Sequence, residues 1–348
     1  MSRADLAREI GLTKVTVSAV VAELIDEGII IDIGPDDRPG VPGKRPTLLT
    51  LCEDHRRIVA VDLTREGRLS GAVMTLTGES MDRRRLETLL CLGPEGVDEL
   101  TNFCQELIAA SATPVLGVGV ATPGLVSPDN NTVRAPKRGW SDLPLEGILT
   151  ERLNLPVAVG NDANCAALGE FAFGATEGSY VLSILVGDGV GAGLVVDGSI
   201  VPGPKGGAGE VAHVTATVNG DGAPWGTPTT CVCGRSGCLG TLLSEPELRE
   251  ALKGLDEAAS EAWLRAVGQR LGAILAPIVA VLDLSDIVLA GPTDLLDGPL
   301  LEAAHDSLRE RVWPSMNPIP RLAMSAIEDR APLVGAGVLV LSRTLGIP

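Results

Sequence analysis

The chain has 348 residues, of which 45 are Asp or Glu and 28 are Lys or Arg, giving a formal net charge of -17 at pH 7. This length predicts two or three domains. The acidic balance excludes a general electrostatic attraction to nucleic acid. It leaves room for a small DNA-binding module, because charges act strongly only within about 8 to 10 Å. Apolar residues make up 45% of the chain and aromatic residues 2%, so we expect a core of Leu, Val, Ile and Ala.

The sequence predicts a cytoplasmic protein without a membrane span. Met1 leads directly into a helical pattern, with no signal peptide. No apolar run reaches the roughly 18 to 20 residues that a membrane helix needs. The longest candidate, Leu271 to Leu282, is short and contains Pro277. Seven cysteines, three of them clustered, favour a metal-binding loop in a reducing compartment over disulfides.

Residues 1–51 are expected to form a winged helix-turn-helix module. Ser2 and Asp5 predict an N-cap pair for a first helix, and Thr13 caps a second helix that Gly28 stops. A generic helix pair is the alternative interpretation. The expected elements are helices at Arg3 to Ile10 and Lys14 to Glu27 and the two strands of a wing at Ile29 to Ile33 and Thr47 to Leu51.

The second helix of such a module places its N-terminal part in the major groove, and the wing contacts phosphates or the minor groove. The module is not basic overall, since it contains six Lys or Arg and eight Asp or Glu. The candidate DNA-binding residues are Lys14, Thr16 and Ser18 on the helix and Lys44 and Arg45 in the wing.

Residues 56–348 have an α/β pattern in which β-rich runs ending in glycine occur in two sets, which predicts two similar lobes with a cleft between them. We expect lobe one at about 56–165 together with the C-terminal end, and lobe two at about 180–334. The predicted strands are Ile58 to Leu63, Leu69 to Leu76, Val115 to Val120, Pro156 to Val159, Val181 to Val186, Gly193 to Val196 and Ile287 to Leu289. The predicted helices are Glu99 to Ala110, Ala163 to Phe173, much of 244–282 and Leu300 to Val312.

A cysteine loop in lobe two has the spacing C-x-C-x4-C, and one histidine lies upstream of it. Three thiolates and an imidazole suit a closed tetrahedral zinc site. The candidate ligands are His213, Cys231, Cys233 and Cys238.

Five segments follow one another in an order that is far more specific than any one of them. They are 117–124 (GVGVATPG), 160–170 (GNDANCAALGE), 187–193 (GDGVGAG), 208–213 (AGEVAH) and the cysteine loop. Together they resemble the ROK family, whose members are sugar-responsive repressors, sugar kinases and open reading frames. The resemblance covers nearly the whole chain. It implies a two-lobed, actin-like sugar-kinase (RNase H-like) fold, and the N-terminal module resembles the repressor branch.

The resemblance also implies roles for single residues. The four candidate zinc ligands match the family's zinc site, where the metal would be structural. Asp162 stands at the position of the kinases' catalytic base. Asn161, Asp162, Glu210 and His213 match sugar-contacting positions. Without the family, a helix cap is an equal alternative for Asn161 and Asp162, and a surface carboxylate is the default for Glu210.

Four departures from the kinase pattern bear on chemistry. Residues 62–67 lack the glycines of the family's first phosphate loop and add Glu66, and Asp188 replaces a common Thr of the second. These changes argue against ATP and Mg²⁺. Gly240 replaces a Glu that contacts the sugar, and Lys137 replaces a common Asn. Lys137 would pair with a phosphorylated or acidic sugar, or be a solvated loop lysine.

The N-terminal module departs from the family as well. Repressors of this kind usually have one more helix at the start, so we expect a truncated module and weak DNA binding. Ala19 stands where recognition helices often carry Arg, Asn or Lys. The apolar face that the missing helix would cover comprises Leu6, Val17, Val21 and Leu24.

These observations predict a ROK-type transcriptional regulator with a degenerate kinase-like core and structural zinc. Its partners would be a DNA operator and a sugar or sugar derivative, and it would be a homodimer or homotetramer. The first alternative is an ATP-dependent, glucokinase-like sugar kinase with Asp162 as general base. A second alternative is a regulator that binds neither ATP nor DNA well and acts through protein partners.

Overall fold

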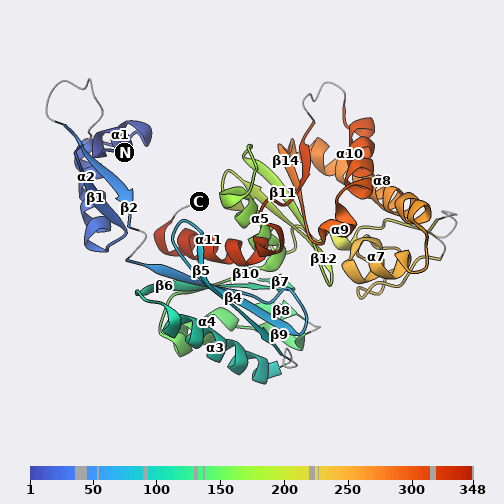
Figure 1. Ribbon diagram of the computed structural model, residues 1–348, viewed down its shortest axis with the longest axis horizontal. Coiled ribbons are helices and arrows are strands. Elements are labelled where there is room, and N and C mark those ends of the chain that lie inside the picture. Colours follow the sequence, from blue (N-terminus) through green and yellow to red (C-terminus); the bar gives the residue numbers. More distant parts are fainter. Residues whose placement is uncertain are drawn as a thin grey trace.

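The computed structural model consists of a small N-terminal unit followed by two units that are each built on a five-stranded mixed sheet (Figure 1). It describes residues 1–35, 45–52, 55–88, 93–128, 132–135, 138–218, 224–225, 227–313 and 319–346. Lys44 and Lys137, two of the candidate site residues, therefore lie outside the described residues.

The N-terminal unit contains two short helices and an antiparallel strand pair, as the sequence predicts. Both predicted caps are present, because the Asp5 backbone N–H donates to Ser2 Oγ and that of Thr16 donates to Thr13 Oγ, each at 3.2 Å. Gly28 follows the second helix with φ of +73°. The elements are α1 (Arg3–Glu9), α2 (Lys14–Asp26), β1 (Ile30–Pro35) and β2 (Thr47–Leu51).

Part of the apolar face of α2 is buried within the N-terminal unit. Val17 and Val21 are each 3% exposed and pack against Ala7 of α1 and Leu49 of β2. Leu6 and Leu24, the other two residues of the predicted face, are partly buried. Val20 of the same helix is 46% exposed. At about 100° per residue it lies on the flank of Val17 that faces away from Val21.

Lobe one is a sheet in the order β10-β6-β3-β4-β5. Val59 and Val61 on the central strand face α3 and α4, while Ala60 points to the opposite face and packs against α11. The strands are β3 (Arg57–Asp62), β4 (Arg68–Met74), β5 (Ser80–Glu87), β6 (Val115–Thr122) and β10 (Val157–Asn161). The helices are α3 (Gly93–Ala110), α4 (Leu145–Leu153) and α11 (Ala331–Leu345), and a small side sheet contains β7 (Leu125–Val126), β8 (Val133–Ala135) and β9 (Trp140–Leu143).

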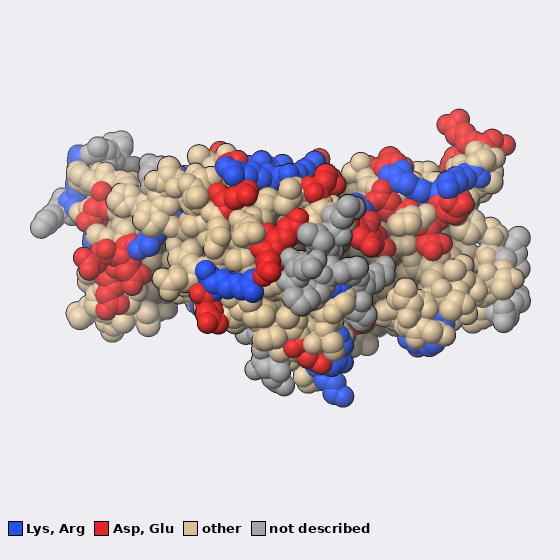
Figure 2. All heavy atoms as spheres, turned by 90° about the horizontal axis from the view of Figure 1, so that it is seen from below, with Lys and Arg blue, Asp and Glu red and all other residues tan. Residues whose placement is uncertain are grey.

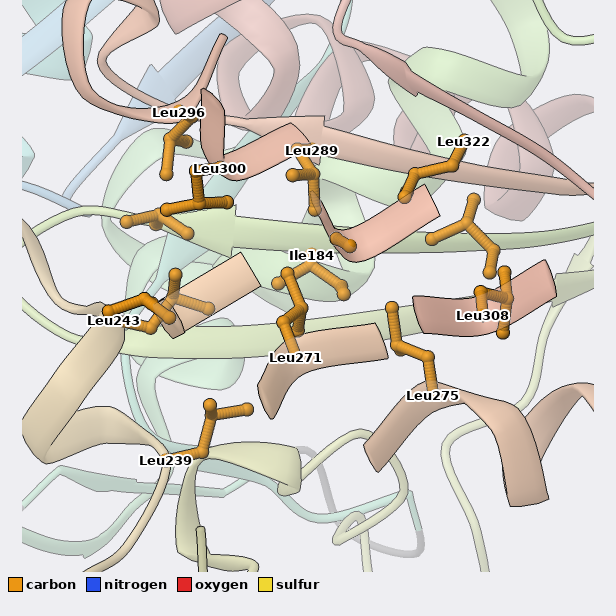
Figure 3. Close-up of a cluster of buried hydrophobic side chains, with 14 of the residues drawn as sticks. Ile184, Leu239, Leu243, Leu271, Leu275, Leu289, Leu296, Leu300, Leu308 and Leu322 are labelled. Atoms are coloured by element: carbon orange, nitrogen blue, oxygen red, sulfur yellow. The ribbon is translucent and has the colours of Figure 1, made fainter. Parts of the chain in front are cut away.

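Lobe two is a sheet in the order β13-β12-β11-β14-β15. Its core is almost entirely aliphatic, with Leu271 and Leu275 of α8 facing Ile184 and Leu289 of the sheet (Figure 3). The strands are β11 (Tyr180–Val186), β12 (Val190–Val196), β13 (Ser199–Ile200), β14 (Asp286–Ala290) and β15 (Arg321–Met324). The helices are α5 (Asp162–Phe173), α6 (Gly240–Leu243), α7 (Glu245–Leu252), α8 (Glu257–Leu282), α9 (Thr293–Leu296) and α10 (Pro299–Arg311), with 3-10 turns η2 (Val211–His213) and η3 (Glu328–Arg330).

The two sheets have one strand topology. In each, the central strand (β3 or β11) pairs with one parallel strand, which in turn pairs with a second parallel strand, and on its other side the central strand begins an antiparallel meander. The sequence predicts this repetition, and the fold class of two similar α/β lobes is confirmed. Strand β5 was not predicted, because its sequence, SMDRRRLE, is mostly polar and it lies at the edge of its sheet.

Helices α5 and α11 pack against each other between the two sheets (Figure 1). Their approach requires glycine, since a Cβ atom on Gly335 of α11 would lie 1.6 Å from the backbone oxygen of Cys165 in α5. Helix α11 contacts strands of lobe one, and α5 contacts β11 and β12 of lobe two. This helix pair therefore joins the lobes.

Helix α8 lies within the helical region that the sequence predicts at 244–282. It runs for 26 residues with Pro277 inside it, and it is long and apolar enough to cross a membrane by length and composition. Leu264, Leu271 and Val279 are nevertheless buried against lobe two, where α8 packs along α10. Its apolar residues thus form part of a protein core.

The N-terminal unit contacts lobe one through a small apolar cluster. Ile29, 4% exposed, belongs to a cluster with Ile58 of β3 and Val340 and Leu341 of α11. The backbone N–H of Cys52 donates to the Ile29 oxygen at 2.8 Å. Ile29 is consequently the residue of the N-terminal unit that is inserted into the core of the larger part.

Candidate metal centre and ligand cleft

The four predicted zinc ligands lie together. One ligand atom from each of His213, Cys231, Cys233 and Cys238 lies within 4.8 Å of all the others. Cys231 Sγ is 3.4 Å from His213 Nδ1, and Cys233 Sγ is 3.6 Å from Cys238 Sγ. Three sulfur atoms and one imidazole nitrogen at this separation form a donor set that zinc prefers.

Backbone hydrogen bonds hold the cysteine loop in its shape. The Cys231 N–H donates to the Arg235 oxygen at 2.7 Å, and the Gly234 N–H returns to the Cys231 oxygen at 2.9 Å. Gly237 has φ of +76°, and a Cβ atom there would lie 2.0 Å from the Thr217 oxygen. A side chain at position 237 would therefore displace the next residue, which is the last cysteine.

The loop is anchored in the core of lobe two. Leu239, which directly follows Cys238, is 1% exposed, and Leu243 is fully buried (Figure 3). The backbone N–H of Leu239 donates to the Val214 oxygen at 2.9 Å, which ties the cysteine loop to the turn after His213. Core packing thus fixes both ends of the donor set.

The surroundings favour a thiolate at Cys233. Hydrogen bonds from the backbone and then from the side chain of Arg235 lower its pKa to about 6. Burial instead raises the pKa of the Cys238 thiol to about 11, with the neighbouring sulfurs acting in the same direction. On the other side of the imidazole, His213 Nε2 is 3.7 Å from Glu210 Oε2. A carboxylate behind a ligating histidine orients the ring toward a metal.

Asn161 and Asp162 lie where β10 meets α5. Asn161 Oδ1 accepts the Asn164 N–H at 3.0 Å, so Asn161 is indeed the helix cap. Its Nδ2 atom donates to the Gly124 oxygen at 2.9 Å and to Asp162 Oδ1 at 3.1 Å. Burial, and then the negative charge of Asp62, raise the pKa of Asp162 to about 7. The cap thus positions a carboxyl group that can exchange a proton near neutral pH.

Two pairs of candidate residues lie next to strand β12. They are Glu210 with His213, and Asn161 with Asp162. The Ala192 N–H of β12 donates to the Gly209 oxygen at 3.0 Å, directly before Glu210. The start of α5 packs on the two glycines of β12 that flank Ala192, which are Gly191 and Gly193. Strand β12 therefore carries one pair on each flank. The Glu210 side chain is 47% exposed, which leaves it accessible to a ligand.

Gly240 lies beside this group, at the start of α6. A Cβ atom there would contact Ala212 at 3.5 Å, an ordinary van der Waals distance. The position therefore has room for a side chain next to the segment of Glu210 and His213.

Arg138, which is 5% exposed in lobe one, was not among the predicted site residues. Its guanidinium donates to the backbone oxygen of Leu63 and lies 5.9 Å from the centre of the Trp140 ring. Its charge also lowers the pKa of Asp162, against the larger effect of burial. Sequence periodicity does not mark Arg138 as a buried residue.

The loop after β3 and the turn between β11 and β12 contact each other. The backbone N–H of Glu66 donates to Asp188 Oδ2 at 2.7 Å, and Arg65 Nη1 lies 3.3 Å from Asp188 Oδ1. Glu66 was expected to add only repulsive charge at this place. Its backbone instead binds the carboxylate that replaces the family's Thr.

The described DNA-binding candidates are accessible. Lys14, Thr16 and Ser18 are all exposed on α2, and Arg45 is exposed before β2. The Thr16 hydroxyl is 2.9 Å from that of Thr13. On the face of the molecule in Figure 2, basic side chains lie among acidic ones, as the net charge suggests.

Two mixed sheets of one strand topology, joined by α5 and α11, and a Cys/His cluster in the second lobe define a protein with a sugar-kinase-like α/β fold. The chain belongs to the ROK family, whose sequence profile matches residues 59–343. It is 27% identical over 386 residues to the xylose repressor of Caldicellulosiruptor bescii, covering 100% of this chain and 93% of that protein. A glucokinase of Halalkalibacterium halodurans is 38% identical over 195 residues, covering 53% of this chain and 56% of the kinase.

The fold comparison agrees with the sequence comparison. A crystal structure of a ROK family transcriptional regulator, a homologue of the E. coli MLC protein, superposes with a TM-score of 0.83. It is 23% identical and covers 99% of this chain and 93% of its own. At this identity the likeness shows a shared fold.

Proposed function

We propose that the chain is a sugar-responsive transcriptional repressor, with a winged helix-turn-helix in residues 1–51 and a ligand-sensing core in residues 56–348. The carrying observation is that the similarity to a xylose repressor extends over the whole chain, including the N-terminal unit, whereas the glucokinase match spans 53% of it. The exposed start of α2 would enter the major groove, and the core would bind a sugar or sugar derivative.

Operator binding tests this proposal. In a mobility-shift assay with DNA from upstream of its own gene, we expect a specific complex that a sugar from a panel dissolves or strengthens. Replacing Lys14, Thr16 and Ser18 together by Ala should weaken binding by about tenfold or more. Lys205→Ala, an exposed lysine of the core, is the matched control. Equal affinity of the triple variant and this control would contradict the assigned DNA-binding face.

The Cys/His cluster would hold a structural zinc ion. The donor set fits zinc because three sulfurs and one ring nitrogen already lie within 4.8 Å of one another. Bound zinc would stabilise the thiolates and keep His213 turned so that Glu210 faces the cleft. We expect elemental analysis to find zinc in wild type and in Cys52→Ser and to find it depleted in Cys233→Ser. Metal retained by Cys233→Ser would exclude this cluster as the site.

The sugar ligand would contact Asn161, Asp162, Glu210 and His213. Gly240 removes one polar contact from the cleft, so the natural ligand would have fewer hydroxyls facing α6 than a ligand of the kinases. Gly240→Glu should change the order of preference within a sugar panel measured by calorimetry. An unchanged order would show that ligands do not reach α6.

A sugar kinase is the second candidate, favoured by the similarity to a glucokinase and by the raised pKa of Asp162. A coupled assay with MgATP and hexoses tests it. We expect no turnover, because Arg65 and Asp188 neutralise each other where a nucleotide phosphate would need the cation. Phosphorylation that Asp162→Asn abolishes would establish the kinase in place of the repressor.

A further inference from the structure

Arg65 connects the two lobes directly. It lies in the loop after β3 of lobe one, and its Nη1 atom is 2.6 Å from Glu245 Oε2 and 3.3 Å from Asp188 Oδ1. Glu245 is the first residue of α7, and Asp188 lies in the turn between β11 and β12, so both carboxylates belong to lobe two. Together with the bond from the Glu66 N–H to Asp188, three contacts cross from one lobe to the other.

The side chains that form these contacts are less exposed than those of ordinary surface ion pairs. The side chains of Arg65, Asp188 and Glu245 are 29%, 35% and 20% exposed. The Glu245 N–H donates to the Gly187 oxygen at 2.9 Å, so one backbone contact holds both carboxylates beside each other. Burial alone would raise the pKa of Glu245, but hydrogen bonds from Arg65 and Arg249 lower it overall. Charge-assisted bonds to a pre-positioned acceptor pair stabilise more than isolated ones.

The same loop is also held from within lobe one. Arg138 donates to the oxygen of Leu63, two residues before Arg65, and Arg138 lies beside Trp140 of β9. The Thr64 N–H donates to the buried Asp62 carboxylate at 2.8 Å. The loop after β3 is thus bound on one side to lobe one and on the other side to lobe two. We call it the tie between the lobes.

A cavity of about 480 Å³ lies behind this tie. Besides Arg65 and Arg68, its charged lining is acidic and comprises Asp62, Glu66, Glu87, Asp188, Glu245, Glu328 and Asp329. Since Arg65 already pairs with two of these carboxylates, the cavity does not attract phosphate groups. At this pocket the two lobes are therefore joined by contacts within the chain.

We propose that Arg65, Asp188 and Glu245 form an inter-lobe latch, which holds the two lobes closed without a nucleotide. The latch itself stands on the contacts described, and its use in signalling rests on the proposed repressor function. A ligand that moves the segment of Arg138 would displace Leu63, and with it Arg65 of the latch.

Hydrogen exchange on the full-length protein, without sugar or DNA, tests the latch independently of that function. Arg65→Gln should speed exchange in residues 62–67 and 185–191 by about five- to tenfold, because fewer charge-assisted bonds oppose local opening. The matched control is Arg249→Gln, which removes an arginine from the same Glu245 but breaks contacts only within lobe two, to Glu245 and Asp294. Circular dichroism verifies that both variants fold.

A double-mutant cycle gives a second, independent reading. Adding Asp188→Asn to Arg65→Gln should have much less effect than Asp188→Asn has alone, since both break the same contact. Additive effects, or equal exchange in Arg65→Gln and Arg249→Gln, would overturn the latch. A change of sugar response in Arg65→Gln would extend it to signalling, and an unchanged response would overturn that role alone.

Discussion

Shortening Leu239 should weaken both lobe two and the metal centre, because this side chain joins them. Leu239→Ala removes about three carbon groups from a site that is 1% exposed. At about 0.8 kcal/mol per buried group, the transfer free energy is roughly 2.4 kcal/mol. The cavity left behind raises the cost to about 3 to 4 kcal/mol, within the range measured for buried Leu to Ala changes.

Thermal unfolding by calorimetry measures this effect. At about 2 to 4 °C for each kcal/mol in a large domain, we expect a loss of roughly 6 to 15 °C for the transition of lobe two. With the proposed zinc ion bound, a chelator should lower the transition of wild type as well, and Leu239→Ala should release the ion at a lower chelator concentration. Val232→Ala is the control, since Val232 lies between two candidate ligands in the same loop but is 82% exposed. Equal shifts in the two variants would refute the idea that core packing positions the cysteines.

Three further changes have defined outcomes. Because the pKa of Asp162 is raised from 3.8 to about 7, the folded state binds the proton more tightly and stability falls as the pH rises through that window; thermal unfolding of Asp162→Asn across it should depend less on pH than wild type, and parallel curves would contradict this. Gly335→Ala should destabilise by several kcal/mol in denaturant unfolding, whereas Gly147→Ala, in an open helical position, should stabilise by about 0.5 to 1 kcal/mol; similar values for both would argue against close helix contact. Ile29→Ala should speed proteolytic cleavage after residue 51, while Ile31→Ala, 38% exposed, should not; equal cleavage would mean that Ile29 does not hold the N-terminal unit in place.

Much of the fold follows from local sequence signals. The caps at Ser2 and Thr13 and the β-rich runs of both sheets are short-range features, and the structure places them where the sequence predicts. Local sequence patterns are weaker where strand pairing decides. Strand β5 was not predicted because its residues are mostly polar, and it forms at the edge of its sheet by pairing with β4.

The candidate site likewise contains some features that the sequence predicts and others that it does not. Cys231, Cys233 and Cys238 are close in sequence, so their spacing identifies the cluster. The contact of Arg65 with Glu245 joins residues 180 positions apart, and no single-sequence pattern encodes such a pair. Arg138 was missed because burial of a charged side chain depends on its partners, which become neighbours only after folding.

The place of α11 in the fold has a consequence for biosynthesis. This last helix covers one face of the first sheet, packing on β3, β6 and β10. Lobe one emerges from the ribosome early, yet the helix that completes it begins at Ala331, whereas β3 begins at Arg57. The apolar strands of lobe one must therefore wait, partly uncovered, until nearly the whole chain has been made. Nascent chains stalled before Ala331 should consequently depend on chaperones.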